Sequence, residues 1–210
     1  MFGDYNIRSL FSKGALFCCL LLALSSFCVS CSETDEQEGE YDNWQQRNEA
    51  YIEKLASSSM KRILTYAKEN TVSSNKISDY VYVEELESGL GDVSPLFTDT
   101  VRFAYRGRYI PTATYTDGLV FDQSYVGDFD WNTIGAYSSV TSANIEGVTT
   151  ALMNMHVGDR WRVYVPYGLG YGTSSSSTGI MAYSTLIFDI ALVDFWHPGE
   201  KRPAFRARQK

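Results

Sequence analysis

Apolar and polar residues alternate in several short stretches of the second half of the chain, the pattern of strands with one buried face. These stretches cover residues 81–86, 101–105, 119–121, 161–165 and 185–193. Residues 148–155 differ, because their apolar positions fall on one face of a helix. No strand–helix–strand rhythm is present. The pattern therefore predicts an α+β domain over residues 79–196, in which an antiparallel sheet wraps around one short helix.

A helical extension is predicted over residues 41–69, before this domain. Its apolar residues recur near helical spacing, at Trp44, Tyr51, Leu55, Ile63, Leu64 and Ala67. Three consecutive serines at 57–59 weaken the middle, so two shorter helices are an alternative. The apolar stripe has two interpretations, a homodimer interface or packing on the chain's own domain. With the polar linker that follows, the extension spans residues 41–78.

Residues 1–30 have the features of a secretory signal peptide. Arg8 and Lys13 precede an apolar run over residues 15–29, which is too short to span a membrane. The run ends at Cys28-Val-Ser-Cys31, which resembles a bacterial lipoprotein processing site with Cys31 as the lipidated N-terminus. Plain cleavage and an uncleaved anchor are the alternatives.

Residues 31–40 are acidic and poor in apolar residues, as expected for a disordered tether. The run also resembles the acidic signal that directs lipoproteins of the Bacteroidetes to the cell surface; the alternative is a solvated spacer. Together these features predict an outer-membrane lipoprotein on the periplasmic face or the cell surface, held to the membrane by its lipid anchor.

The formal net charge of −7 argues against nucleic acid as a partner, because phosphate binding needs clustered basic residues. A basic tail over residues 197–210 either contacts anionic lipid or is a frayed, soluble end. All 4 cysteines lie at or before Cys31, so the exported domain has no disulfide, thiolate nucleophile or cysteine metal site. His156 and His197 are far apart in the sequence, and no metal or other cofactor is expected.

Six separated motifs in the second half of the chain together resemble one family. In chain order they are Val101-Arg-Phe-Ala-Tyr105-Arg-Gly107, Asp117-Gly-Leu-Val-Phe121-Asp122-Gln-Ser124, Ile145-Glu-Gly147, Met155-His-Val-Gly158-Asp-Arg-Trp161, residues 166–172, and Ser184-Thr-Leu-Ile-Phe188-Asp-Ile190. The order is similar to that of the FK506-binding-protein (FKBP) family of peptidyl-prolyl cis-trans isomerases. The resemblance covers about half of the chain, and it implies a curved half-barrel of five to six strands around a short central helix.

The resemblance also implies a substrate pocket built from seven residues. Wall residues would be Tyr105, Phe121, Ile180 and Phe188, and Asp122 would be the pocket carboxylate. The backbone N–H of Ile145 would hydrogen-bond the substrate, and the hydroxyl of Tyr171 would contact its carbonyl.

This chain departs from the family at the pocket floor. Many members have a Trp directly after the glycine of the Ile-x-Gly motif, where this chain has Val148. A second aromatic residue is expected before the helix, and Phe129 and Trp131 are the candidates. Residues 108–116 and 123–144 are longer than the family's usual connections, and we expect them to shape the rim of the pocket.

Rotation about an X–Pro bond has a barrier of about 18–20 kcal/mol, which arises from amide resonance. An apolar pocket that holds proline and removes water from its carbonyl favours the twisted amide, without a nucleophile or metal. The resemblance therefore implies isomerisation of X–Pro bonds in unfolded or exported polypeptides. Two alternatives remain. One is a non-catalytic polypeptide-binding or chaperone lipoprotein, and the other is a structural lipoprotein whose pocket is plugged by Trp131 or Met181.

Overall fold

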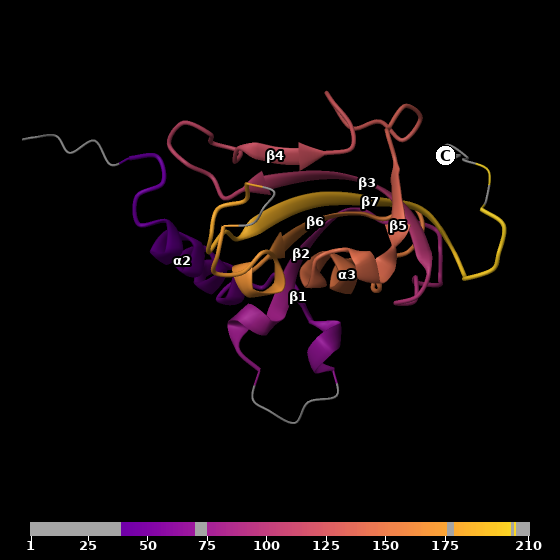
Figure 1. Cartoon of the computed structure of the whole chain (residues 1–210), viewed down its shortest axis with the longest axis horizontal. Coiled ribbons are helices and arrows are strands. Elements are labelled where there is room, and N and C mark those ends of the chain that lie inside the picture. The colour runs from indigo at the N-terminus through magenta and orange to yellow at the C-terminus, as the bar shows by residue number, and fades with distance from the viewer. Residues whose placement is uncertain (1–38, 70–74, 176–178, 203, 205–210) are drawn as a thin grey trace, which may run out of the picture. The chain divides into compact units, whose positions relative to one another are not determined.

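An antiparallel sheet forms the centre of the computed structural model, which describes residues 39–69, 75–175, 179–202 and 204. Within that part of the chain seven strands pair: β1 (Lys61–Leu64), β2 (Tyr80–Glu87), β3 (Thr100–Tyr109), β4 (Val120–Gln123), β5 (Tyr137–Val140), β6 (Arg160–Val165) and β7 (Leu186–Trp196). The order is β1-β2-β6-β7-β3-β4, and β5 pairs with β3. Figure 1 shows the sheet curving over helix α3 (Glu146–Leu152), with helix α2 (Trp44–Ala56) at one end. The predicted α+β fold is confirmed.

Several predicted segments lie outside the described residues. They are the signal peptide at 1–30, most of the tether with Cys31, and the end of the basic tail. The described residues from Gly39 onward belong to one compact unit. Its remaining elements are short 3-10 helices: η2 (Tyr66–Lys68), η3 (Ile77–Asp79), η4 (Thr141–Ala143) and η5 (Tyr167–Leu169).

The alternation of side chains divides the sheet into two faces. On β3, Phe103, Tyr105 and Tyr109 point to the concave face, because successive residues of a strand point to opposite sides. On β7, Phe188 and Ile190 lie on that same face, where the register pairs Ile190 with Tyr105. The main core therefore fills the space between the concave face and α3.

Helix α3 approaches the sheet closely because Gly147 has no side chain. A Cβ at this position would lie 2.4 Å from Cγ1 of Val165 on β6, far inside contact distance. Val148, Leu152 and Met155 point into the core below the sheet, each at most 5 % exposed. The glycine of the Ile-x-Gly motif thus sets the spacing between the helix and the sheet.

The helix predicted over residues 41–69 is wrong in its second half. Helix α2 ends at Ala56, where the hydroxyls of Ser57 and Ser58 donate to the backbone oxygens of Glu53 and Leu55. Serine side chains that bond to the backbone compete with helix continuation. The chain then forms β1, which pairs with β2 at the edge of the sheet. The fold therefore starts well before residue 79.

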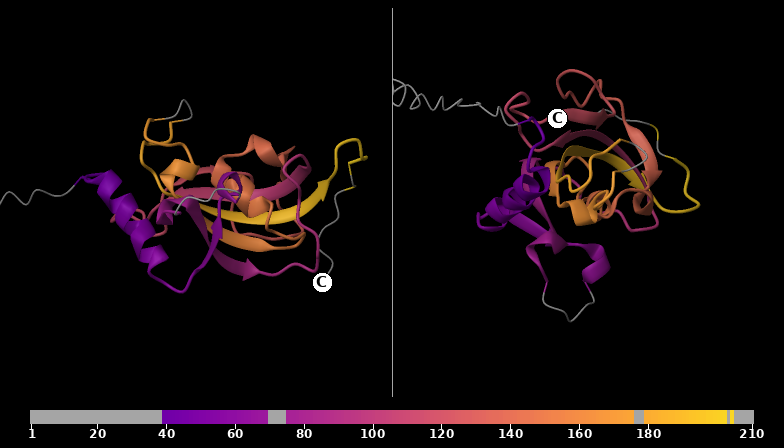
Figure 2. Two further views of the ribbon diagram at one scale, coloured as in Figure 1. Left: turned by 90° about the horizontal axis from the view of Figure 1, so that it is seen from below. Right: turned by 60° about the vertical axis from the view of Figure 1, so that its left-hand side comes forward.

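The apolar stripe of α2 packs on the chain's own domain, which was one of its two interpretations. Tyr51 and Leu55 of the stripe pack against a cluster on the convex face of the sheet, formed by Ile52, Tyr82, Tyr164 and Ile187, in which Ile52 is 4 % exposed. Figure 2 shows α2 beside one end of the sheet in both views.

The long segment over residues 123–144 contains a strand that was not predicted, and other residues of this segment pack on the convex face of the sheet. Strand β5 pairs with the first residues of β3. Phe129 and Trp131 cluster with Ala104 and Ala191, which point away from the concave face. The expectation that Phe129 or Trp131 completes the pocket is therefore wrong.

Candidate active site

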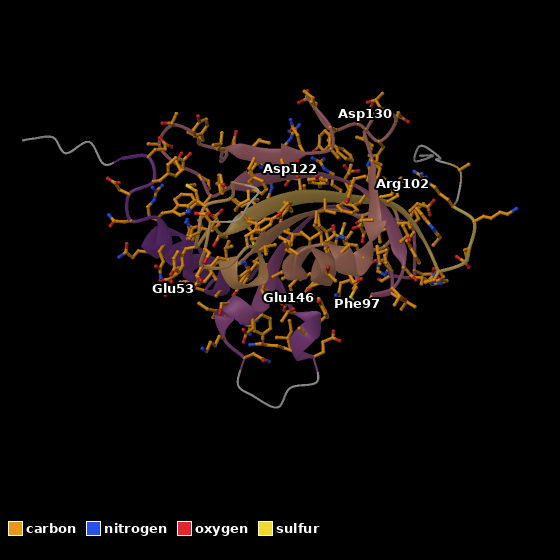
Figure 3. All side chains as sticks on the ribbon, in the orientation of Figure 1. Glu53, Phe97, Arg102, Asp122, Asp130 and Glu146 are labelled. Atoms are coloured by element: carbon orange, nitrogen blue, oxygen red, sulfur yellow. The ribbon has the colours of Figure 1, made fainter. Side chains whose placement is uncertain are left out.

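A pocket of about 380 Å³ opens on the concave side of the sheet, beside the start of α3. Its lining is mostly aromatic and aliphatic, with one carboxylate: Phe103, Tyr105, Phe121, Asp122, Tyr137, Ala143, Asn144, Ile145, Val148, Tyr171, Phe188 and Ile190. Figure 3 shows Asp122 on β4, the strand drawn along the top of the sheet. Such a cavity, apolar with a few convergent polar groups, suits a small apolar group that carries a hydrogen-bond acceptor.

The aromatic wall of the pocket is built by four strands, β3, β4, β5 and β7. Phe121 on β4 and Phe188 on β7 meet edge to face, with ring centroids 5.6 Å apart and planes at 87°. Tyr105 on β3 lies 6.5 Å from the Phe188 ring and 6.2 Å from the Tyr137 ring on β5. Edge-to-face contacts of this kind hold aromatic rings in fixed orientations. The wall is therefore set by the pairing of β3 with its neighbours.

Gly107 allows Phe121 and Phe188 to meet over β3. A Cβ at Gly107 would lie 2.6 Å from Cζ of Phe121 and 2.8 Å from Cε1 of Phe188. In the register, Gly107 stands opposite Asp122 on β4 and Phe188 on β7. Any side chain at this position would displace one of the two rings.

The polar groups of the pocket are a hydrogen-bonded pair, Tyr105 and Asp122, and the separate hydroxyl of Tyr171. Tyr105 donates its hydroxyl proton to Oδ2 of Asp122 at 2.8 Å, while Oδ1 of Asp122 accepts from the Gln123 backbone N–H at 2.8 Å. Burial raises the pKa of Tyr105 well above its usual range, and the hydrogen bond to Asp122 adds to the rise. Burial likewise raises the pKa of Tyr171, with a further contribution from the Asp122 charge. Both hydroxyls therefore remain protonated hydrogen-bond donors at neutral pH.

The start of α3 contributes the floor and a backbone donor. Ile145 is the residue that caps the helix, and backbone N–H groups at a helix start have no partner within the helix. Val148 is 5 % exposed and lines the pocket at the position where the family resemblance implied a Trp. The floor is therefore apolar but smaller than an aromatic floor.

Six of the seven residues predicted for the pocket lie around it; the exception is Ile180. That residue is 4 % exposed and packs in the main core instead of lining the cavity. The catalytic roles of all seven stay predictions. Trp131 and Met181, the candidates for plugging the pocket, do not line it either.

Sequence reasoning missed Phe103, Tyr137 and Ile190 as lining residues. Alternation could have found two of them, because Phe103 and Ile190 lie two residues from Tyr105 and Phe188 on the same face. Tyr137 had no such signal. It lies on the short strand β5 inside a polar segment, and it supplies the second aromatic residue that was sought at Phe129 or Trp131.

Comparison with known proteins agrees with this geometry. Residues 91–193 match the family described as FKBP-type peptidyl-prolyl cis-trans isomerase. The chain is 29% identical over 194 residues to the macrophage infectivity potentiator of Trypanosoma cruzi, covering 92% of this chain and 88% of that protein. It is 38% identical over 99 residues to human peptidyl-prolyl cis-trans isomerase FKBP10, covering 47% of this chain but 15% of the human protein.

Among solved structures, FkpA from Escherichia coli has the same fold, with a TM-score of 0.53 and 22% sequence identity. That likeness covers 92% of this chain and 74% of FkpA. The family match, the relatives and the pocket together identify residues 91–193 as a domain of the FKBP-type peptidyl-prolyl cis-trans isomerase family.

Proposed function

We propose that this pocket catalyses cis-trans isomerisation of X–Pro bonds by binding the proline ring against Phe121 and Phe188. The observation that carries the proposal is the combination of aromatic walls with two protonated hydroxyls at one cavity. Rotation needs no bond to be broken. Its barrier of about 18–20 kcal/mol comes from resonance in the planar amide, so a site that weakens this resonance lowers the barrier. A dry aromatic site favours the twisted amide, because its carbonyl is less polarised than that of the planar form.

The polar groups have separate roles in this mechanism. The Tyr171 hydroxyl donates to the substrate carbonyl. Tyr171 lines the pocket and is 38% exposed, so an entering chain can reach it. The Tyr105 hydroxyl is already held by Asp122, so this pair fixes the shape of the wall. The Ile145 N–H aligns the chain beside the proline. Donors placed for the geometry of the twisted amide stabilise it more than the planar form, and they do so without a reorganisation cost.

Protease-coupled isomerisation of short X–Pro peptides tests this function. The assay uses the soluble piece that starts at Ser32, beside a double variant carrying Tyr171→Phe and Phe188→Ala. We expect wild-type acceleration above the uncatalysed rate and a loss of about 10–100-fold in kcat/KM in the double variant. Tyr115→Phe, outside the pocket and 40% exposed, is the matched control and keeps the wild-type rate. Equal rates for wild type and double variant would disprove catalysis at this pocket.

Polypeptide binding without turnover is a second candidate, and the small Val148 floor favours it, since the floor offers less aromatic area to a proline. A peptide that binds at the pocket, as measured by calorimetry, without acceleration for any residue before proline would support this candidate over catalysis. Suppression of aggregation of an unfolded client protein would then measure the chaperone activity.

We further propose that the chain acts on exported polypeptides while anchored to the outer membrane through a lipid on Cys31. Support comes from the apolar N-terminal run and the cysteine that follows it. In the described part of the chain, no helix is long and apolar enough to cross a bilayer. Metabolic labelling with radioactive palmitate tests the anchor: wild type should carry label in the membrane fraction, and Cys31→Ala should not. Label that persists in Cys31→Ala would refute the anchor.

A further inference from the structure

Helix α2 lies outside residues 91–193, yet it holds the chain segment that leads into the pocket. Asn48 on this helix is fully buried, and its Oδ1 accepts a hydrogen bond of 2.7 Å from the Thr185 backbone N–H. Its Nδ2 donates to the Trp44 backbone oxygen at 2.7 Å. Both polar ends of the amide are therefore bonded. Thr185 is also fully buried, three residues before Phe188 on the pocket wall.

Trp44 makes a second link from α2 to the same segment. Its indole N–H donates to Oγ of Ser184 at 2.9 Å, and Ser184 in turn donates to the Met181 backbone oxygen at 2.8 Å. The Trp44 ring also meets the Tyr109 ring edge to face at 5.8 Å. Tyr109 then contacts Phe121, the pocket wall on β4, with centroids 5.2 Å apart. The helix is thus connected to the wall by ring contacts as well as hydrogen bonds.

The segment between Met181 and Thr185 contains a strained turn. Tyr183 has φ of 59°, a left-handed conformation that is unfavourable for a non-glycine residue and persists only where surrounding contacts enforce it. Its N–H donates to the Gly172 backbone oxygen at 3.0 Å, directly beside Tyr171. The turn that α2 secures therefore also secures the residue that presents the Tyr171 hydroxyl.

We propose that Asn48 is a positioning residue of the isomerase pocket, acting through Thr185 and the turn at Tyr183 on Tyr171. This inference rests on the proposed function. Asn48 does not touch substrate. It fixes the strained turn at Thr185, so that Tyr171 and Phe188 keep their places relative to each other. Small displacements of a positioning contact lower the rate more than the affinity, because the twisted amide demands closer placement than the ground state.

The test compares Asn48→Ala with Ile52→Ala in the full chain, purified in detergent. Both substitutions remove a buried side chain from α2, but Ile52 packs on the convex face among Tyr82, Tyr164 and Ile187, away from the turn. At a temperature well below both melting points, we expect Asn48→Ala to lower kcat about tenfold with KM changed less than threefold. Ile52→Ala should lower Tm and leave kcat within twofold of wild type.

Equal kcat values for wild type, Asn48→Ala and Ile52→Ala would overturn the proposal and leave Asn48 a purely structural residue. If Asn48→Ala does not fold, Trp44→Phe takes its place, because it removes the N–H that reaches Ser184 and keeps a smaller aromatic ring against Tyr109. A smaller loss of kcat in the same direction is then expected, and an unchanged kcat would overturn the proposal.

Hydrogen exchange at the Tyr183 and Thr185 amides separates this inference from the proposed function. We expect faster exchange in Asn48→Ala than in Ile52→Ala. If wild type lacks isomerase activity, the proposed function fails, and with it the role in catalysis. Faster exchange would then still show that Asn48 holds the turn, whereas unchanged exchange in both variants would refute that contact as well.

Discussion

At the scale of single residues, the shape of the pocket depends on the absence of a side chain at Gly107. Phe121 and Phe188 occupy the space that a side chain on β3 would take. Their edge-to-face contact is therefore possible only above a glycine. This requirement concerns space rather than backbone freedom, and it explains why a glycine follows Tyr105 by two residues on a strand that is otherwise rich in large side chains.

Gly107→Ala should damage both stability and activity. The new methyl group overlaps two wall rings, and overpacking of this kind costs about 1–3 kcal/mol. We expect urea unfolding to show that loss, and kcat/KM for an X–Pro peptide to fall about tenfold because the wall is displaced. Gly168→Ala is the control, since a Cβ there meets nothing within 4 Å. A Gly107→Ala variant as stable and active as the Gly168→Ala variant would contradict this account.

At the scale of elements, the far end of β7 is tied to the start of β3 by an ion pair. The ring Nδ1–H of His197 donates to Oδ1 of Asp99 at 2.7 Å, and Asp99 is fully buried. The hydrogen bond to Asp99 and the charge of that carboxylate raise the pKa of His197, and the charge of Glu200 adds to the rise. The contact joins neighbouring strands where their pairing ends, at Thr100 and Trp196.

This pair predicts a pH dependence of stability. Because the folded pKa of His197 lies above its unfolded value of about 6.5, the contribution is complete below that pH and is lost as pH rises through the folded pKa. Thermal melts should therefore show Tm decreasing as pH rises above about 6.5. His197→Gln should have a flatter profile over the same range. Parallel profiles for the two proteins would show that this histidine makes no such contribution.

At the scale of the whole molecule, the fold is larger than the family domain. Strand β1 covers the edge of β2, and α2 covers Tyr82, Tyr164 and Ile187 on the convex face. Both elements precede residue 79, where the sequence pattern predicts the domain to begin. An edge strand and an apolar patch would be open to solvent without them, and both favour aggregation.

A chain that starts at residue 79 should therefore be less stable than one that starts at Gly39. We expect its free energy of unfolding in urea to be lower by about 3–5 kcal/mol, comparable to the loss of a large core side chain. Light scattering should also detect association of the shorter chain. Equal unfolding curves for the two chains would establish residue 79 as the true domain start and would reduce α2 and β1 to additions.

The local pattern was sufficient to predict most strands and α3, because alternation and helical spacing depend only on residues that are neighbours in the sequence. The motifs were sufficient to predict the family and six pocket residues, because residues such as Tyr105, Phe121 and Phe188 lie within short sequence motifs that resemble those of the family. The sequence by itself thus determined the fold class and the family.

The tertiary structure decided what depends on contacts between distant segments. Residues 61–64 have helical spacing but form β1, because pairing with β2 outweighs local preference. Tyr137, and not Trp131, completes the aromatic wall, because β5 pairs with β3 while Trp131 turns to the other face. Asn48 meets Thr185 across 137 residues of chain, and only folding brings them together.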